Sequence, residues 1–158
     1  GGGMSSRLFQ EIREKRGLCY TIFAQAGAFS DSGMITVYAG TSGAQLPKLL
    51  ELTFAELGRA ANDLSVSELE RARAQMKAGM LMGLESASNR AERLARQIQV
   101  WGYVPDLEEI VAKIENVTLD RLRSFAAHTA EHAPTSLALY GPINRAPSLA
   151  EIKHNSAA

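Results

Sequence analysis

Two side chains near the start of the sequence carry hydrogen-bond donors that can act on one oxygen atom. Arg13 and Tyr20 are seven positions apart, the arginine in the last turn of a predicted helix and the tyrosine near the start of a predicted strand. A guanidinium and a phenol can both donate to an oxygen on which negative charge develops in a transition state. The alternative is that Arg13 is a solvated helix residue and that Tyr20 is half in the core, because most arginines are exposed.

A second pattern lies near the end of the sequence, where His128-Thr129-Ala130-Glu131-His132 has the spacing of the H-x-x-E-H zinc motif. On a helix the two histidines would share a face, and Glu131 could act as a base. A catalytic zinc also needs a third protein ligand, and the only glutamate after the motif is Glu151. Pro134 further places the motif at a helix end. We therefore predict that this chain binds no metal.

The helix that carries Arg13 is predicted over residues 4–16. Its apolar residues Met4, Leu8 and Ile12 recur at four-residue spacing and so share one face. The glycine at position 17 suits the left-handed conformation that ends many helices. Arg13 is therefore expected in the last turn, directly before the chain turns into a strand.

The strand that carries Tyr20 is predicted to be half of an antiparallel hairpin. Residues 18–29 and 34–41 both alternate, and Asp-Ser-Gly at 31–33 is a turn signal between them. The predicted faces of the first strand are Leu18, Tyr20, Ile22 and Ala24 on one side, and Cys19, Thr21, Phe23 and Gln25 on the other.

Helical periodicity dominates the rest of the chain. Ser65 and Glu68 form a capping box, a pattern typical of a helix start. Because strands and helices do not alternate regularly, we predict an α+β fold with a small, mainly antiparallel sheet and helices packed on one face. The predicted elements are helices over 46–61, 65–101 with a joint near Gly83, 106–114 and 119–130, a last strand over 135–140, and a polar, frayed tail from 144.

Composition excludes some classes of partner. The 158 residues include 17 basic and 17 acidic side chains, so no bulk charge favours nucleic acid or an anionic membrane. No apolar run is long enough to span a bilayer. We expect neither nucleic acid nor a membrane as partner. The single cysteine, Cys19, excludes an internal disulfide and favours a reducing compartment such as the cytoplasm or a matrix, but the localisation stays open.

The run from Gly1 to Tyr20 resembles a known family. Its letters include Ser-Arg-Leu-Phe-Gln-Glu-Ile-Arg-Glu-Lys-Arg-Gly-Leu over 6–18, and softer likeness extends through 85–95 and 117–122. This run resembles the C-terminal domain of pitrilysin/insulinase-type (inverzincin) zinc metallopeptidases, near the mitochondrial-processing-peptidase branch. In that family the run lies inside the domain. The resemblance therefore implies a fragment, with residues 1–143 a partial, N-terminally truncated peptidase domain and 144–158 a polar tail.

The resemblance also implies roles for individual residues. Arg13 and Tyr20 would be the catalytic pair that reaches from this domain into the active site, where attack of a zinc-bound water on a peptide carbonyl places negative charge on oxygen. Gly1, Gly2 and Gly3 would bind substrate through their backbone amides, the alternative being that they form a flexible end. The zinc ligands would lie in a missing N-terminal catalytic domain, so zinc would belong to the parent enzyme and this chain alone would be inactive.

Two functions follow from these observations. In the first, the chain is the substrate-binding part of a zinc-dependent endopeptidase that cleaves peptides or unfolded protein segments. In the second, it is a non-catalytic subunit or scaffold domain of the same ancestry that acts in protein association. An unpaired edge of the truncated sheet would then allow a homo-oligomer. The presence of both Arg13 and Tyr20 favours the first.

Overall fold

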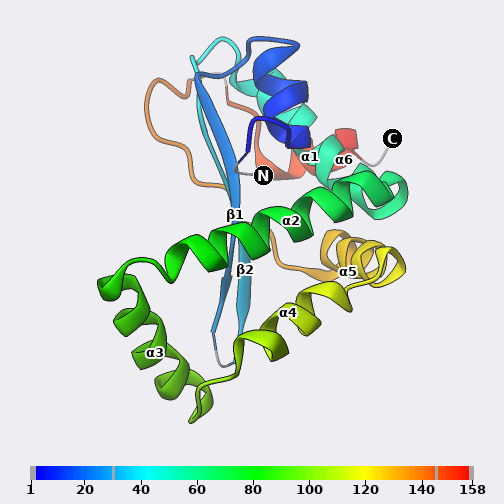
Figure 1. The fold of residues 1–158 in the computed structure, drawn as a ribbon. Helices are drawn as coiled ribbons and strands as arrows, with labels where there is room; N and C mark the ends of the chain where they lie inside the picture. The colour runs from blue at the N-terminus through cyan, green and yellow to red at the C-terminus, as the bar shows by residue number, and fades with distance from the viewer. Residues whose placement is uncertain (1–2, 30, 145, 157–158) are drawn as a thin grey trace. The chain divides into compact units, whose positions relative to one another are not determined.

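The computed structural model describes residues 3–29, 31–144 and 146–156. Its elements follow in the order η1, β1, β2 and α1 to α6 (Figure 1). The chain divides into two compact units, Gly1–Asn62 with Ala126–Ala158 and Asp63–Phe125. The fold class is α+β, as predicted.

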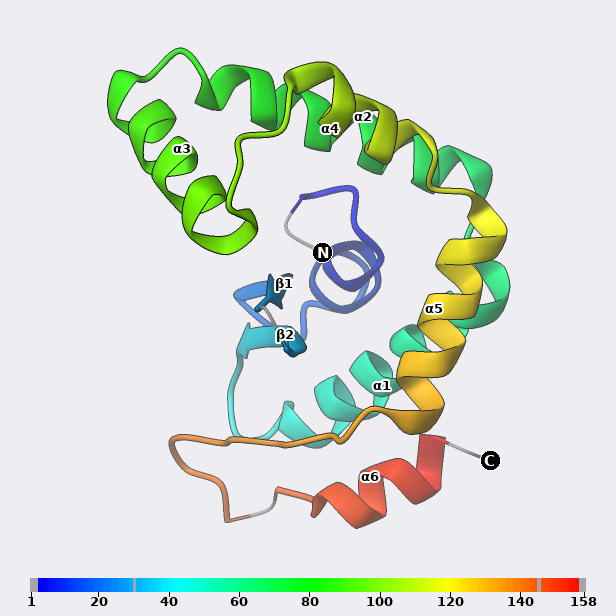
Figure 2. The same ribbon diagram turned by 90° about the horizontal axis from the view of Figure 1, so that it is seen from below.

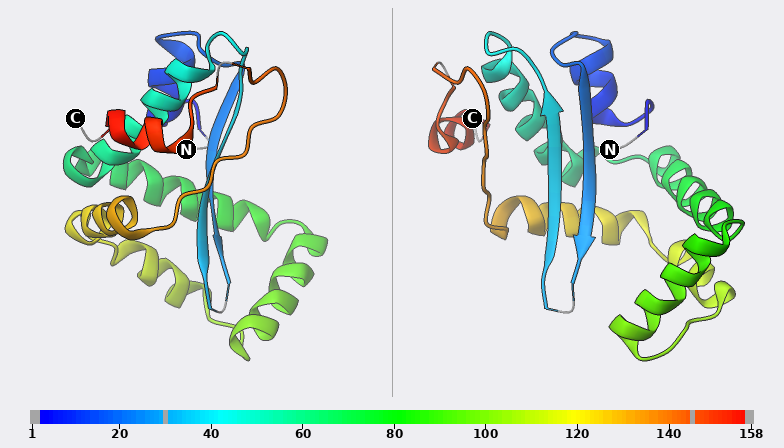
Figure 3. Two further views of the ribbon diagram at one scale, coloured as in Figure 1. Left: turned by 180° about the vertical axis from the view of Figure 1, so that it is seen from behind. Right: turned by 90° about the vertical axis from the view of Figure 1, so that its left-hand side faces the viewer.

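The predicted hairpin is confirmed. Strand β1 (Thr21–Ala28) pairs antiparallel with β2 (Gly33–Gly40), so that Ile22 lies opposite Ala39 and Ala24 opposite Val37. The right-hand view in Figure 3 shows the two strand arrows pointing in opposite directions. Within the described residues the sheet contains these two strands and no other.

One face of the hairpin is covered by helices, as predicted. The π-helix η1 (Phe9–Glu14) and helix α1 (Leu46–Asp63) lie on the same side of the strands (Figure 2). Ile12 of η1 is fully buried, and burying an aliphatic side chain of this size contributes about 1.5–3 kcal/mol. The buried residues of this core are Leu8, Phe9, Ile12, Cys19, Ile22 and Leu49.

Cys19 differs from its predicted position. The alternation of the sequence placed it on the face of Thr21 and Phe23, but its side chain is buried in the core with Ile22. Strand β1 begins only at Thr21, so the two-residue period does not yet apply at position 19.

The predicted strand over 135–140 is not a strand in the structure. Residues 134–140 form no ladder, although Leu137 and Leu139 are partly buried and pack against Leu46 and Leu50 of α1. The alternation was therefore correct about which side chains face the core. A strand also needs a neighbouring strand for its backbone hydrogen bonds, and the alternation gives no information about whether one is present.

The segment from 144, predicted as a frayed polar tail, contains helix α6 (Leu149–Ser156). Ser148 accepts a hydrogen bond from the backbone N–H of Glu151, whose carboxylate accepts one from the backbone N–H of Ser148, which is a capping box. Ile152 is 3% exposed and packs against Leu46 and Leu50. Ile152, with the partly buried Ala146 beside it, thus anchors this segment to α1.

The second unit is helical. The predicted helix over 65–101 is two helices, because the chain breaks just after Gly83 and Ser86 caps a new start. Arg73 lies on α2 (Val66–Gly83). Its guanidinium donates to the carbonyls of Glu115 and Val117 and so holds the C-terminal end of α4 (Leu107–Glu115). No helix in the described residues is both long and apolar enough to cross a bilayer. The helices are α2 (Val66–Gly83), α3 (Ala87–Trp101), α4 (Leu107–Glu115) and the first part of α5 (Leu119–His132).

Candidate functional site

A widened helical turn positions Arg13. The backbone N–H of Lys15 donates to the carbonyl of Gln10, five residues earlier, at 3.0 Å. Turns of this π type are rare and occur frequently at functional sites. The helix then ends on Gly17, whose φ of +60° is left-handed and whose N–H donates to the carbonyl of Arg13 at 2.9 Å.

The Arg13 side chain lies between two aromatic rings. Its guanidinium carbon is 4.5 Å from the centroid of the Phe9 ring and 5.9 Å from that of Tyr20. Such contacts contribute about 0.5–1 kcal/mol at an exposed site. No hydrogen bond or ion pair engages this guanidinium in the described part of the chain. Its N–H groups are therefore available to a ligand.

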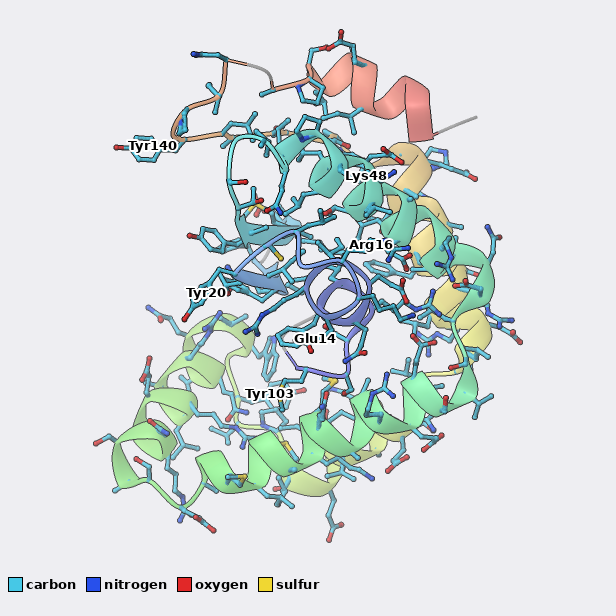
Figure 4. All side chains as sticks on the ribbon, turned by 90° about the horizontal axis from the view of Figure 1, so that it is seen from above. Glu14, Arg16, Tyr20, Lys48, Tyr103 and Tyr140 are labelled. Atoms are coloured by element: carbon cyan, nitrogen blue, oxygen red, sulfur yellow. The ribbon has the colours of Figure 1, made fainter. Side chains whose placement is uncertain are left out.

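Tyr20 presents its phenol to solvent. The side chain is 86% exposed, so Tyr20 is not half in the core (Figure 4). Its backbone is fixed, because the N–H of Tyr20 donates to the carbonyl of Gly40 at 2.9 Å. Among the described residues the hydroxyl has no hydrogen-bond partner. A rigid backbone therefore carries an available donor.

A shallow depression adjoins Tyr20. Burial raises the pKa of the Cys19 thiol in its wall, although nearby Arg13 opposes the shift, so Cys19 stays a neutral, unreactive side chain at neutral pH. The lining residues are Gly17, Cys19, Tyr20, Gly40, Thr41, Ser42 and Gln45.

The sequence did not predict Phe9, Thr41 and Gln45 as residues of this site. The spacing of Phe9 and Arg13, one helical turn apart, was the available signal for the first.

The glycines of the predicted substrate-binding segment are only partly described. Gly1 and Gly2 lie outside the described residues. The carbonyl of Gly3 accepts the backbone N–H of Ser6 at 2.9 Å and so closes a turn before η1. The substrate-binding role of the three glycines stays a prediction.

The histidines of the H-x-x-E-H pattern lie at the end of α5. The rings of His128 and His132 stack at 4.7 Å, and both side chains are exposed. Nδ1 of His132 lies 3.2 Å from the carbonyl oxygen of His128 and 3.8 Å from the carboxylate of Glu131. The described residues contain no group of three or more His, Cys, Asp or Glu side chains placed to hold a metal. This donor set does not fit a catalytic zinc, which needs three protein ligands.

Comparison with known proteins identifies the family. Residues 1–76 match the family described as the peptidase M16 inactive domain. The chain is 37% identical over 144 residues to an uncharacterized zinc protease of Streptomyces coelicolor, covering 90% of this chain and 31% of the relative. It is 36% identical over 151 residues to the uncharacterized zinc protease YmxG of Bacillus subtilis, covering 94% and 36%. These matches confirm the predicted resemblance to a fragment of the C-terminal domain of the peptidase M16 family, whose inactive-domain model matches residues 1–76.

Solved structures share the fold. A chain of complex III2 from Candida albicans superposes with a TM-score of 0.70 at 20% identity, covering 77% of this chain and 29% of that one. A conserved protein from Enterococcus faecalis gives a TM-score of 0.68 at 27% identity, covering 80% and 29%. The chain thus spans about a third of the length of the relatives and structures it matches.

Proposed function

We propose that this chain is the substrate-binding C-terminal part of a zinc-dependent endopeptidase. Arg13 and Tyr20 contribute to an active site whose zinc ligands lie in another domain of the parent protein. The observation that carries the proposal is the placement of the Arg13 guanidinium, which has no hydrogen-bond or ion-pair partner among the described residues, beside the exposed phenol of Tyr20. The names of the relatives, which are zinc proteases, support the reaction class.

The two side chains suit the stabilisation of an oxyanion. When a peptide carbonyl is attacked, its oxygen gains negative charge, and donors already in place stabilise that charge without having to reorganise. Tyr20 donates its hydroxyl proton in a hydrogen bond to this oxygen. Arg13 contributes a permanent positive charge and further N–H donors, and it can also hold a carbonyl of the bound peptide.

The parent protein supplies what this chain lacks. The description of the family as an inactive domain agrees with the absence of a three-ligand metal set among the described residues. The partner of the site is therefore an N-terminal catalytic domain, and the substrate is a peptide or an unfolded protein segment. In this account the histidines at 128 and 132 are surface residues without a metal.

A second function is protein association. It is favoured by the two-stranded hairpin, whose outer edges are unpaired within the described residues. Unpaired strand edges are templates for pairing with another chain. A second copy of this chain would then cover the edge, and Arg13 and Tyr20 would have no catalytic part.

The experiment compares the isolated chain with the complete parent protein. We expect the parent to cleave an unfolded peptide, to lose activity with a chelator and to regain it with zinc, while the isolated chain neither cleaves nor retains stoichiometric zinc after dialysis. Zinc that is retained by the chain and lost in His128→Ala would show that His128 is part of a metal site. A parent protein without zinc-dependent cleavage would favour the association function.

A further inference from the structure

We propose that Thr41, with help from Gln45, is a positioning residue that sets the separation of Arg13 and Tyr20. Both residues lie in the loop between β2 and α1, and neither contacts the Arg13 side chain in the interactions described above. The expected effect on catalysis rests on the proposed function. The expected effect on the position of Tyr20 does not rest on it, because that position is a property of this chain alone.

The segment between Arg13 and Tyr20 is held by the β2–α1 loop. The Thr41 hydroxyl donates to the carbonyl of Leu18 at 2.5 Å, a bond between residues 23 positions apart. Nε2 of Gln45 donates more weakly to the carbonyl of Gly17 at 3.4 Å. The loop therefore contacts the segment at 17 and 18, and Gly40, the last residue of β2, contacts it at 20.

These bonds act on a short turn outside the regular elements. Neither Leu18 nor Cys19 belongs to η1 or to β1, and the N–H of Leu18 donates to the carbonyl of Ile12 at 3.0 Å while its carbonyl accepts the Thr41 hydroxyl. The left-handed Gly17 sets the direction of the chain as it leaves η1. The hydrogen bond from Thr41 then holds the Leu18 carbonyl in place between η1 and β1. A shift of the Leu18 carbonyl moves the Tyr20 backbone only two residues away.

The loop also packs closely against Pro142. A Cβ atom at Gly43 would lie 2.7 Å from the carbonyl oxygen of Pro142, closer than real Cβ contacts. The loop that carries the Thr41 hydroxyl is therefore held by a packing contact as well as by its bonds to the 17–20 segment.

The structural arm of the test uses this chain with 13C-labelled tyrosine. Tyr20 is assigned by the signal lost in Tyr20→Phe. We expect Thr41→Val, which keeps the shape but removes the donor, to shift the Tyr20 ring signals and to weaken the cross-peaks between this ring and Arg13. Thr41→Ser restores the hydroxyl and should restore both. Thr36→Val is the matched control, because Thr36 lies on β2, the strand that leads into this loop, and has no hydrogen bond to the 17–20 segment among the described residues; it should leave Tyr20 unchanged.

The functional arm uses the complete parent protein. Thr41→Val should lower kcat by roughly tenfold to a hundredfold with little change in KM, because a displaced donor is lost mainly from the transition state. Thr41→Ser should recover most of the loss, which a purely structural defect would not predict. If Thr41→Val does not fold, Gln45→Ala removes the second hold on the segment and should give a smaller shift in the same direction.

The outcomes separate the two claims. Unchanged Tyr20 signals in folded Thr41→Val, or in folded Gln45→Ala if the first variant does not fold, overturn the positioning role whatever the kinetics show. Shifted signals with an unchanged kcat in both Thr41→Val and Tyr20→Phe leave the positioning intact and overturn the proposed catalytic function.

Discussion

The carbonyl of Arg13 accepts the N–H of Gly17 at 2.9 Å, so the residue that presents the guanidinium also takes part in ending the helix. The left-handed Gly17 then redirects the chain, and the ring of Tyr20, the seventh residue after Arg13, lies with its centroid 5.9 Å from the guanidinium carbon. The spacing of the pair is therefore a consequence of how the helix ends. An insertion between these residues would separate the two donors without changing either of them.

Replacement of Arg13 should impair catalysis and binding together. In the complete parent protein, Arg13→Ala should lower kcat and raise KM, because a long cation can contact both the ground-state peptide and the transition state. Stability should change by no more than about 1 kcal/mol, the worth of the lost cation–π contacts. Steady-state kinetics beside a thermal melt measure both effects. Arg71→Ala, on the exposed side of α2, is the matched control and should leave the kinetics unchanged.

The end of η1 should be sensitive to acid. Hydrogen bonds from Lys15 and from Arg16, the latter at 2.8 Å, hold the pKa of Glu11 below its ordinary value of 4.5. Because the pKa is lowered in the folded state, the stabilisation is complete above pH 4.5 and is lost as the pH falls through the folded pKa. Because the Lys15 and Arg16 side chains that hold Glu11 are themselves exposed to solvent, this stabilisation should be below about 1 kcal/mol.

Urea unfolding of the chain between pH 6 and pH 3 tests this prediction. Glu11→Gln should be less stable than the native chain at pH 6, and the two should converge toward pH 3. Glu14→Gln, three residues along the same helix and exposed, is the control and should show no such convergence (Figure 4). A constant difference between Glu11→Gln and the native chain across the range would contradict the assigned ion pairs.

The burial of Ile152 should make α6 part of the core. Ile152→Ala should lower the free energy of unfolding by about 2–5 kcal/mol, since it removes a buried aliphatic side chain. Ile143→Ala is the matched control, because that isoleucine is 43% exposed. Denaturant melts of both variants compare the two sites. Equal, small losses would show that residues 149–156 do not pack against α1.

The sequence predicted the elements whose signals are local. The hairpin follows from alternation with a turn between, and the start of α2 follows from Ser65 and Glu68, whose side chains make the expected reciprocal bonds. The break after Gly83 also lies where the joint was expected. In each case a few neighbouring residues determine the geometry.

The missed features depend on contacts between distant residues. Leu137 and Leu139 alternate as a strand does, but a strand also needs a partner, which no local pattern can report. Ile152 lies in a segment with few apolar residues, and its burial depends on α1. The bond from Thr41 to Leu18 joins two residues whose types carry no pairing signal. The resemblance to a known family was enough to predict Arg13 and Tyr20 as a pair. It gave no indication of the loop between β2 and α1, which we propose positions them.

The central claim is that Tyr20 stabilises the transition state of peptide cleavage, and the turnover of Tyr20→Phe in the complete parent protein tests it most directly. Removing one oxyanion donor typically costs about 3 kcal/mol. We therefore expect kcat to fall roughly a hundredfold, with a smaller change in KM and an unchanged melting temperature, because the hydroxyl has no partner among the described residues and is exposed. An unchanged kcat in a folded Tyr20→Phe protein would contradict the account.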